Sequence, residues 1–366
     1  MPTNIQLTDF PAYQLEGKTL DSGWYVEKRL PSFHDRLRDP ALTGGFFSVG
    51  YLVSKGTGKN KEEGFLKAFD IASLLQNHGN DLLRTIQEVT TSFNFERDML
   101  EYCKSAKMTK IVRAVDDGNT SILFNGQSQP VFYLIFERAD GDIRKVIETT
   151  GKVEDGWKLK HLHDVAVGVQ QLHINNVSHQ DIKPSNVLIF ETKNEGAKIG
   201  DLGRASRNGL QSAHDGCAIV GARAYAPPEQ LYGHTPTDWI SKREACDLYH
   251  LGSLIVFLFT GSSANNGLFE NLPEPLNFKN WRGKYEDVLP HLVDAFTVFL
   301  DKLQYQFPEW ARDDLTLMVK QMCHPDYKNL RGDPDARKQT ANPIGIDRFV
   351  SKLDRLAKRA VIEARS

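Results

Sequence analysis

Apolar residues recur at helical spacing in the middle of the chain and at strand spacing shortly afterwards. Intervals of 3, 4 and 3 residues predict a helix whose apolar face carries Leu162, Val165, Val169 and Leu172. Two short apolar runs, residues 187–190 and 197–199, flank the turn-forming residues 193–196 and predict a hairpin. This hairpin would bring Asn186 and Asp201, at its two ends, to the same place.

The earlier part of the chain reads mainly as strands. Residues 46–53 and 64–69 are predicted strands joined by the turn 56–61, and residues 131–136 form a third. The third strand ends at residues 137–142, the expected hinge between a sheet-rich part and a helical part. We therefore expect three regions, which are an extension over residues 1–21, a smaller sheet-rich lobe over 22–138 and a larger helical lobe over 139–366.

One long helical stripe interrupts the predicted strands and carries a charge. Its apolar members, at spacings of 4, 3 and 4, are Leu82, Ile86, Val89 and Phe93. The same stripe continues through Glu96 to Leu100. An ionised carboxylate on a packed face is costly unless a cation meets it, and Lys67 is the natural partner. The alternative is that the helix turns Glu96 to the solvent-exposed rim.

Composition excludes several classes of protein. Lys and Arg total 45 against 47 Asp and Glu, so the formal charge of −2 gives no global attraction to nucleic acid or to an anionic membrane. The four cysteines are scattered, which is typical of a reducing compartment and favours the cytoplasm. The start of the chain lacks the pattern of a secretory signal. The most apolar run, residues 254–259, is far shorter than the roughly 20 residues of a membrane span and predicts a buried helix.

Candidate chemistry is concentrated in a polar segment just after the predicted helix. The segment contains a carboxylate that could act as a base, Asp181, and a cation, Lys183. It also contains two side chains that could be oxygen ligands of a metal ion, Asn186 and Asp201. Phosphoryl transfer needs these groups, because its transition state requires alignment and charge neutralisation. The alternative is a polar loop whose Asp and Asn side chains only form turns. The packed helix and the hairpin on either side favour the functional interpretation.

These residues carry a resemblance to protein kinases. His179–Asn186 resembles the catalytic loop His-Arg-Asp-x-Lys-x-x-Asn, with Gln180 in place of the arginine, and residues 201–203 resemble the Asp-Phe-Gly motif, with leucine in place of the phenylalanine. The resemblance is to the bacterial type of eukaryotic-like serine/threonine kinase. It implies an α+β, two-lobed fold with a small antiparallel-sheet N-lobe and a mainly helical C-lobe. It also implies ATP and Mg²⁺, with Asp181 and Lys183 catalytic and Asn186 and Asp201 as magnesium ligands.

The resemblance extends to nucleotide binding. Residues 65–67 resemble the third-strand lysine motif, which implies that Lys67 holds the α- and β-phosphates and pairs with Glu96. Residues 43–50 resemble a degenerate glycine-rich loop in which Thr43 and Ser48 replace glycines. The residues assigned by resemblance to nucleotide binding are Gly44, Gly45, Phe47, Lys67, Glu96, Glu137 and Ala139.

Further matches lie downstream. Residues 221–229 resemble the end of the activation segment, which implies a buried ion pair for Glu229 with either Arg331 or Arg337. Asp247 matches the aspartate of the central helix that supports the catalytic loop. Gln180 removes the arginine that often receives an activating phosphate, so control by phosphorylation is disfavoured. Ala222 replaces a common Ser or Thr. Arg204 could pair with a phosphate on either of two possible phosphosites, Ser206 and Ser212.

The sequence thus predicts a serine/threonine protein kinase. Lys183 favours a protein substrate with a Ser or Thr acceptor, and neither a nucleic acid nor a membrane span is expected; no oligomeric state is predicted. One alternative is a pseudokinase scaffold, motivated by the motif departures, and another is a small-molecule phosphotransferase. Zinc-type pairs at 161–163 and 323–324 lack suitable spacing or partners. Phe349, Leu353 and Leu356 predict a docked amphipathic helix near the end.

Overall fold

The computed structural model describes residues 10–31, 48–71, 82–124, 126–212, 214–338 and 344–365. These residues form two compact units. The first unit comprises the described residues within Met1–Ser105 and Val112–Ala139, and the second comprises those within Ala106–Ile111 and Asp140–Ser366. Each unit is described by itself.

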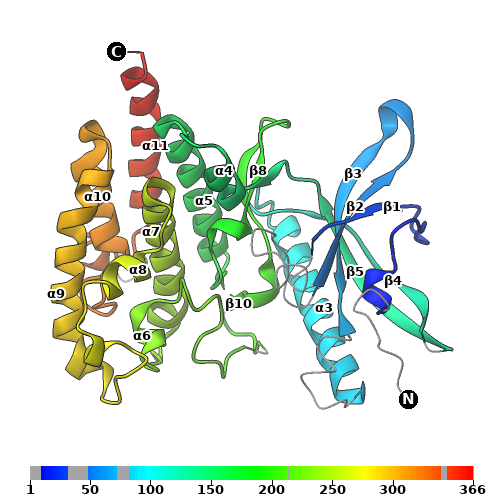
Figure 1. The fold of residues 1–366 in the computed structure, drawn as a ribbon, viewed down its shortest axis with the longest axis horizontal. Helices are drawn as coiled ribbons and strands as arrows, with labels where there is room; N and C mark the ends of the chain where they lie inside the picture. Colours follow the sequence, from blue (N-terminus) through cyan, green and yellow to red (C-terminus); the bar gives the residue numbers. More distant parts are fainter. Residues whose placement is uncertain are drawn as a thin grey trace. The chain divides into compact units, whose positions relative to one another are not determined.

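The first unit is an antiparallel sheet accompanied by one long helix. Its strands are ordered β1-β2-β3-β5-β4, and α3 (Leu82–Ser105) is the helix drawn in cyan beside them in Figure 1. The strands are β1 (Tyr25–Arg29), β2 (Ser48–Lys55), β3 (Glu62–Phe69), β4 (Ala114–Phe124) and β5 (Gln127–Glu137). Every neighbouring pair is antiparallel, and the turn between β2 and β3 contains the short 3-10 helix η3 (Gly58–Asn60).

Alternation along the strands builds the core of this unit. Val49, Tyr51 and Val53 on β2 are buried because alternate residues share one face of a strand. This face packs against the segment before β1, where the Tyr51 hydroxyl donates a 2.7 Å hydrogen bond to the Ala12 carbonyl in η2 (Pro11–Tyr13). The bond pairs a polar group that would otherwise be costly to bury.

The sequence located three of the five strands and missed two. The predicted strands are present as β2, β3 and β5, although residues 46–47 lie outside the described part of the chain. β4 was missed because its apolar residues stand at its two ends and residues 116–121 between them are polar or glycine, so this edge strand shows no regular apolar alternation. β1 is only five residues long and shows no clear alternation.

The second unit is mainly helical. Its longest helices are α5 (Asp155–Ile174), α7 (Ala245–Thr260), α9 (Tyr285–Leu303), α10 (Arg312–Met322) and α11 (Ile346–Glu363). Shorter helices are α4 (Ile143–Thr149), α6 (Pro228–Leu231) and α8 (Ala264–Phe269). The four residues of the predicted stripe on α5 are fully buried, and the apolar run at 254–258 lies buried in α7, as predicted. The α+β fold expected from the sequence is therefore confirmed.

The predicted hairpin is also present. β8 (Val187–Phe190) pairs antiparallel with β9 (Gly196–Ile199), and β6 (Gly141–Asp142) adds a short third strand. Just beyond the paired residues, the Gly200 amide donates a 2.8 Å hydrogen bond to the Asn186 carbonyl. The hairpin therefore returns the chain beside Asn186 immediately before Asp201.

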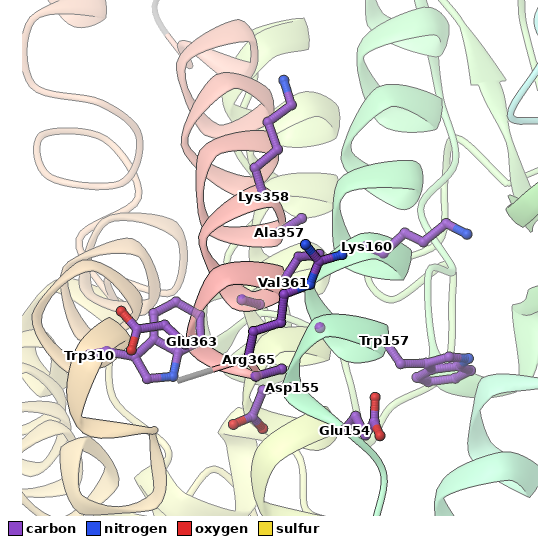
Figure 2. A pocket seen from close by; sticks show the side chains of 13 residues that line it. Glu154, Asp155, Trp157, Lys160, Trp310, Ala357, Lys358, Val361, Glu363 and Arg365 are labelled. Atoms are coloured by element: carbon purple, nitrogen blue, oxygen red, sulfur yellow. The ribbon is translucent and has the colours of Figure 1, made fainter.

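The last helix packs along the second unit. α11 buries Phe349, Leu353 and Leu356 and contacts α5, beside which it stands in Figure 1. A hollow of about 790 Å³ opens where the last turns of α11 meet the first turn of α5, lined by Trp157, Lys160, Trp310, Val361 and Arg365 among others (Figure 2). None of the helices in the described ranges is long and apolar enough to cross a lipid bilayer.

Candidate active site

The catalytic-loop residues predicted from the sequence converge on the carboxylate of Asp181. Lys183 Nζ lies 2.6 Å from Asp181 Oδ2, and Asn186 Nδ2 donates to the same oxygen at 3.2 Å and to the Asp181 carbonyl at 2.8 Å. Asn186 ends a short 3-10 turn, η4 (Pro184–Asn186), which Pro184 starts with its fixed φ. Three of the four predicted polar groups therefore form one hydrogen-bonded cluster.

His179 connects this cluster to Gly200, the residue before Asp201. Its Nε2 donates to the Gly200 carbonyl at 3.0 Å, and its Nδ1 accepts from the Asp181 amide at 3.2 Å. One donor and one acceptor define a neutral imidazole protonated at Nε2. The buried ring thus connects the residue before Asp201 to the main chain of Asp181.

Asp247, in the first turn of α7, binds the main chain of the catalytic loop. Its carboxylate accepts from the amides of His179 at 2.8 Å and Gln180 at 2.7 Å, and from His173 Nε2 at 3.0 Å. Burial would raise the pKa of Asp247, but the hydrogen bond from His173 lowers the pKa overall. The fixed anion therefore holds two consecutive amides of the catalytic loop, as the sequence predicted.

Two residues of the site adopt left-handed backbone conformations that favour glycine. Gln180 has φ of 64° and Asp201 has φ of 63°, although both carry a Cβ. Such conformations persist only where surrounding contacts impose them, and they concentrate at functional sites. Here the amide of Gln180 is held by Asp247, and Asp201 follows the Gly200–Asn186 hydrogen bond.

In the first unit, Lys67 on β3 and Glu96 on α3 form the predicted ion pair. Lys67 Nζ lies 2.9 Å and 2.8 Å from the two carboxylate oxygens, and Glu96 is 1% exposed. The alternative in which Glu96 turns to the rim is therefore wrong. The charge interrupts the apolar stripe of α3 because β3 supplies the cation that compensates it.

The other proposed nucleotide-binding residues are less informative. Gly44, Gly45 and Phe47 lie outside the described residues. The Glu137 carboxylate accepts hydrogen bonds from the Arg113 amide at 2.9 Å and from the Arg113 guanidinium at 3.1 Å. Both of these contacts lie within the first unit. Ala139 is half-buried and follows β5 without regular secondary structure.

Comparison with known sequences assigns the family. The family described as "Protein kinase domain" matches residues 82–330, which is more than half of the chain. The chain belongs to the protein kinase family. The matched range contains Glu96 and the whole Asp181 cluster of the kinase domain, whereas Lys67 and the residues of the glycine-containing segment precede it.

Curated relatives are similar over parts of their length. The chain is 29% identical over 227 residues to serine/threonine-protein kinase PknB of Mycolicibacterium smegmatis, an alignment that covers 58% of this chain and 34% of the relative. It is 31% identical over 285 residues to CTD kinase subunit alpha of Saccharomyces cerevisiae, which covers 70% and 52%. A third relative, serine/threonine-protein kinase atg1 of Dictyostelium discoideum, is 27% identical over 66% of this chain and 32% of its own length. The chain thus spans about a third to a half of the length of these relatives.

Glu229 of the kinase domain pairs with Arg331 rather than with Arg337. The two guanidinium nitrogens of Arg331 lie 2.6 Å and 2.8 Å from the two carboxylate oxygens, and both side chains are almost completely buried. Burial would lower the pKa of Arg331, but the charge of Glu229 raises it overall. Arg337 instead donates to the Gly332 carbonyl at 3.3 Å.

Sequence reasoning missed one group that contacts Asp181. The Ala222 amide donates a 2.7 Å hydrogen bond to Asp181 Oδ1, so a main-chain group holds the oxygen that Lys183 does not. The preceding Gly221 permits this approach, because a Cβ there would lie 2.3 Å from the Gln180 carbonyl and 2.8 Å from Asp181 Oδ1. The sequence shows that residue 221 is a glycine, but nothing in it indicates that this glycine lies against Gln180 and Asp181.

We expect Gly221→Ala to lower kcat of the kinase domain by at least about tenfold. The added methyl would press on the backbone of the catalytic loop, where no flexible side chain can yield, and displace Asp181. Gly216→Ala is the matched control, since a Cβ there meets nothing within 4 Å. Steady-state kinetics of both variants, with circular dichroism to verify folding, checks this; equal activity of the two variants would contradict it.

The two candidate phosphosites are buried. Ser206 is 1% exposed and Ser212 6% exposed, and their hydroxyl oxygens lie 3.3 Å apart. Arg204 NH1 lies 3.1 Å from His214 Nδ1, so it already has a partner within the segment. Both possible phosphosites are therefore shielded from solvent in this conformation.

Proposed function

We propose that this chain is a protein serine/threonine kinase that transfers the γ-phosphate of ATP to a Ser or Thr hydroxyl of a protein. The observation that carries the proposal is the Asp181 carboxylate, held by the Ala222 amide on one oxygen and by Lys183 and Asn186 on the other. The family match and the relatives that are named serine/threonine-protein kinases support this class of reaction.

In this proposal Asp181 receives the substrate. Its carboxylate is fixed in direction by three donors and can accept the hydroxyl proton as the oxygen attacks phosphorus. Lys183 brings an ammonium to 2.6 Å from the same carboxylate and places positive charge beside the transferring group. Lys67, supported by Glu96, would hold the α- and β-phosphates, while Glu137, Ala139 and the segment with Gly44, Gly45 and Phe47 would contact the nucleotide.

Asn186 and Asp201 fit a magnesium site. Asn186 donates both of its described hydrogen bonds through Nδ2, which turns its Oδ1 away from Asp181, and the Asp201 side chain is exposed. Both groups offer the oxygen atoms that Mg²⁺ prefers. When bound, the ion would neutralise phosphate charge. No cluster of three or more His, Cys, Asp or Glu side chains suited to a metal exists among the described residues, so phosphate oxygens and water would complete the coordination.

The proposed partner is a protein that carries the acceptor hydroxyl, and we propose no nucleic-acid partner. The proposed compartment is the cytoplasm. All four cysteines are free thiols, and Cys103, Cys246 and Cys323 are buried, which suits a reducing compartment.

Transfer of ³²P from γ-labelled ATP to mixed Ser/Thr peptide substrates tests the proposed function. We expect label on Ser or Thr of the acceptor, dependence on magnesium and saturation with ATP. Binding of ATP without transfer to any acceptor would contradict the proposal and support the scaffold alternative instead. Label on a small molecule but on no peptide would support a small-molecule phosphotransferase.

Asp201→Asn is expected to raise the magnesium concentration required for half-maximal activity. Removal of a residue that only supports a metal ligand lowers metal affinity by roughly 10- to 100-fold. Asp201 is proposed as a ligand itself, so loss of its charge should lower magnesium affinity by at least this much. Titration of activity with magnesium at fixed ATP measures the shift. Asp335→Asn is the control, because that carboxylate pairs with Lys338 at the surface; identical titration curves for the two variants would remove Asp201 from the proposed site.

A further inference from the structure

Arg243 places a buried guanidinium next to the catalytic loop. It belongs to the π-helical turn η6 (Ile240–Glu244) that precedes α7, and it is 3% exposed. Its NH2 donates to Asp215 Oδ1 at 2.7 Å, and its NH1 donates to Gln180 Oε1. A buried cation is tolerated only where such partners compensate its lost hydration. Arg243 therefore connects the residue before Asp181 with the segment that follows Asp201.

Gln180 extends the connection through the other end of its amide. Its Nε2 donates to Ser206 Oγ at 2.7 Å and to the Arg204 carbonyl at 3.0 Å. Ser206 begins β10 (Ser206–Arg207), which pairs with β7 (Val177–Ser178) just before the catalytic loop. An amide is suited to this position because it accepts from a guanidinium and donates to a hydroxyl at the same time.

Asp215 supplies the negative charge. Its Oδ2 accepts from the Ser212 amide at 2.8 Å, its Oδ1 from the Ser212 hydroxyl at 3.2 Å, and its carbonyl from Lys242 Nζ at 3.2 Å. Burial would raise the pKa of Asp215, but the Ser212 amide and the charge of Arg243 lower the pKa overall. The carboxylate is thus ionised at neutral pH and held from both sides.

We propose that Arg243 and Asp215 are positioning residues, whose ion pair, joined by Gln180, holds the segment after Asp201 in its catalytic arrangement without phosphorylation. The Asp215 carboxylate takes the place of a phosphate as the anion. The cation is Arg243, because residue 180 is an uncharged glutamine. This inference rests on the proposed kinase function. It explains how a loop with an uncharged residue at 180 and buried serines at 206 and 212 is ordered.

The test uses Asp215→Asn, because Asp215 is 40% exposed at its side chain and its replacement leaves the buried Arg243 in place. Loss of a hydrogen bond to a charged group is expected to lower kcat by about 10- to 100-fold with little change in KM for ATP. Asp215→Glu, which keeps the charge, should restore part of the rate. Asp354→Asn, which removes a surface partner of Lys358 on α11, should leave kcat unchanged.

Hydrogen exchange provides a second measurement that does not depend on catalysis. Amides of residues 202–212 should exchange faster in Asp215→Asn than in the wild type, while those of α5 and α9 should not change. Unchanged exchange would overturn the inference, whether or not the wild type transfers phosphate. Faster exchange with an unchanged kcat would overturn the positioning role. An inactive wild type would count against the proposed function. In that case, faster exchange in Asp215→Asn would still show that the Arg243–Asp215 ion pair orders residues 202–212.

Phosphatase treatment completes the test. Wild-type protein whose mass shows no phosphate should keep its full kcat. Loss of activity on dephosphorylation, followed by recovery when Ser206 or Ser212 is phosphorylated again, would overturn the inference.

Discussion

Asp181→Asn is expected to lower kcat for phosphoryl transfer by about 10²- to 10⁴-fold, the range for removal of a general base. The structure gives a second reason for a large effect. Asp181 Oδ2 receives donors from both Lys183 and Asn186, and Oδ1 receives the Ala222 amide. An asparagine must set its own NH₂ group against one of these donors, so it loses orientation as well as basicity.

Rapid-quench and steady-state assays of Asp181→Asn measure the loss. Nucleotide affinity and the circular dichroism spectrum should stay close to wild type, because Asp181 anchors no helix. Asp313→Asn, an exposed carboxylate on α10, is the matched control. Undiminished turnover of Asp181→Asn would remove this residue from the proposed chemistry.

Arg331→Met is expected to lower the free energy of unfolding by about 3–5 kcal/mol, because it leaves Glu229 buried without its counter-charge. Arg331 also donates to the His324 carbonyl at 3.1 Å, so its removal leaves a second buried acceptor unsatisfied. For a unit of this size, the loss corresponds to a fall in Tm of roughly 6–20 °C.

Urea denaturation followed by tryptophan fluorescence measures this effect. Arg337→Met is the matched control, since Arg337 is half-buried and makes no ion pair with Glu229; it should cost about 1 kcal/mol or less. Replacement of both members, Glu229→Gln with Arg331→Met, should recover part of the loss, because no lone charge then remains buried. Equal destabilisation by Arg331→Met and Arg337→Met would contradict this account of the pair.

Several features could be predicted from local sequence because their physical causes are local. Apolar periodicity located α3, α5, α11 and the hairpin β8–β9, since a helix or strand buries residues at a fixed interval. Lys67 and Glu96 could be matched before the structure was known, because a charge on an apolar face requires a partner. The polar group around Asp181 was found from its residue types and spacing.

Other features were decided only by the tertiary structure. The choice of Arg331 over Arg337 depends on which of two nearby arginines meets Glu229 about one hundred residues away. The contact of Arg243 with Gln180 and Asp215 joins three segments whose separate sequences give no sign of it. β4 was missed because its apolar residues are gathered at its two ends and do not alternate with polar ones along the strand.

The sequence by itself therefore determined the fold class, the order of most elements and the identity of the polar groups, because periodicity and motif chemistry operate within a few residues. Only the tertiary structure decided the orientation of those groups. It placed the Ala222 amide on Asp181, made Gly221 necessary there, and gave the uncharged Gln180 a guanidinium from Arg243. Hydrogen bonds and ion pairs depend on distance and direction in space, and these are fixed only when segments distant in sequence pack together.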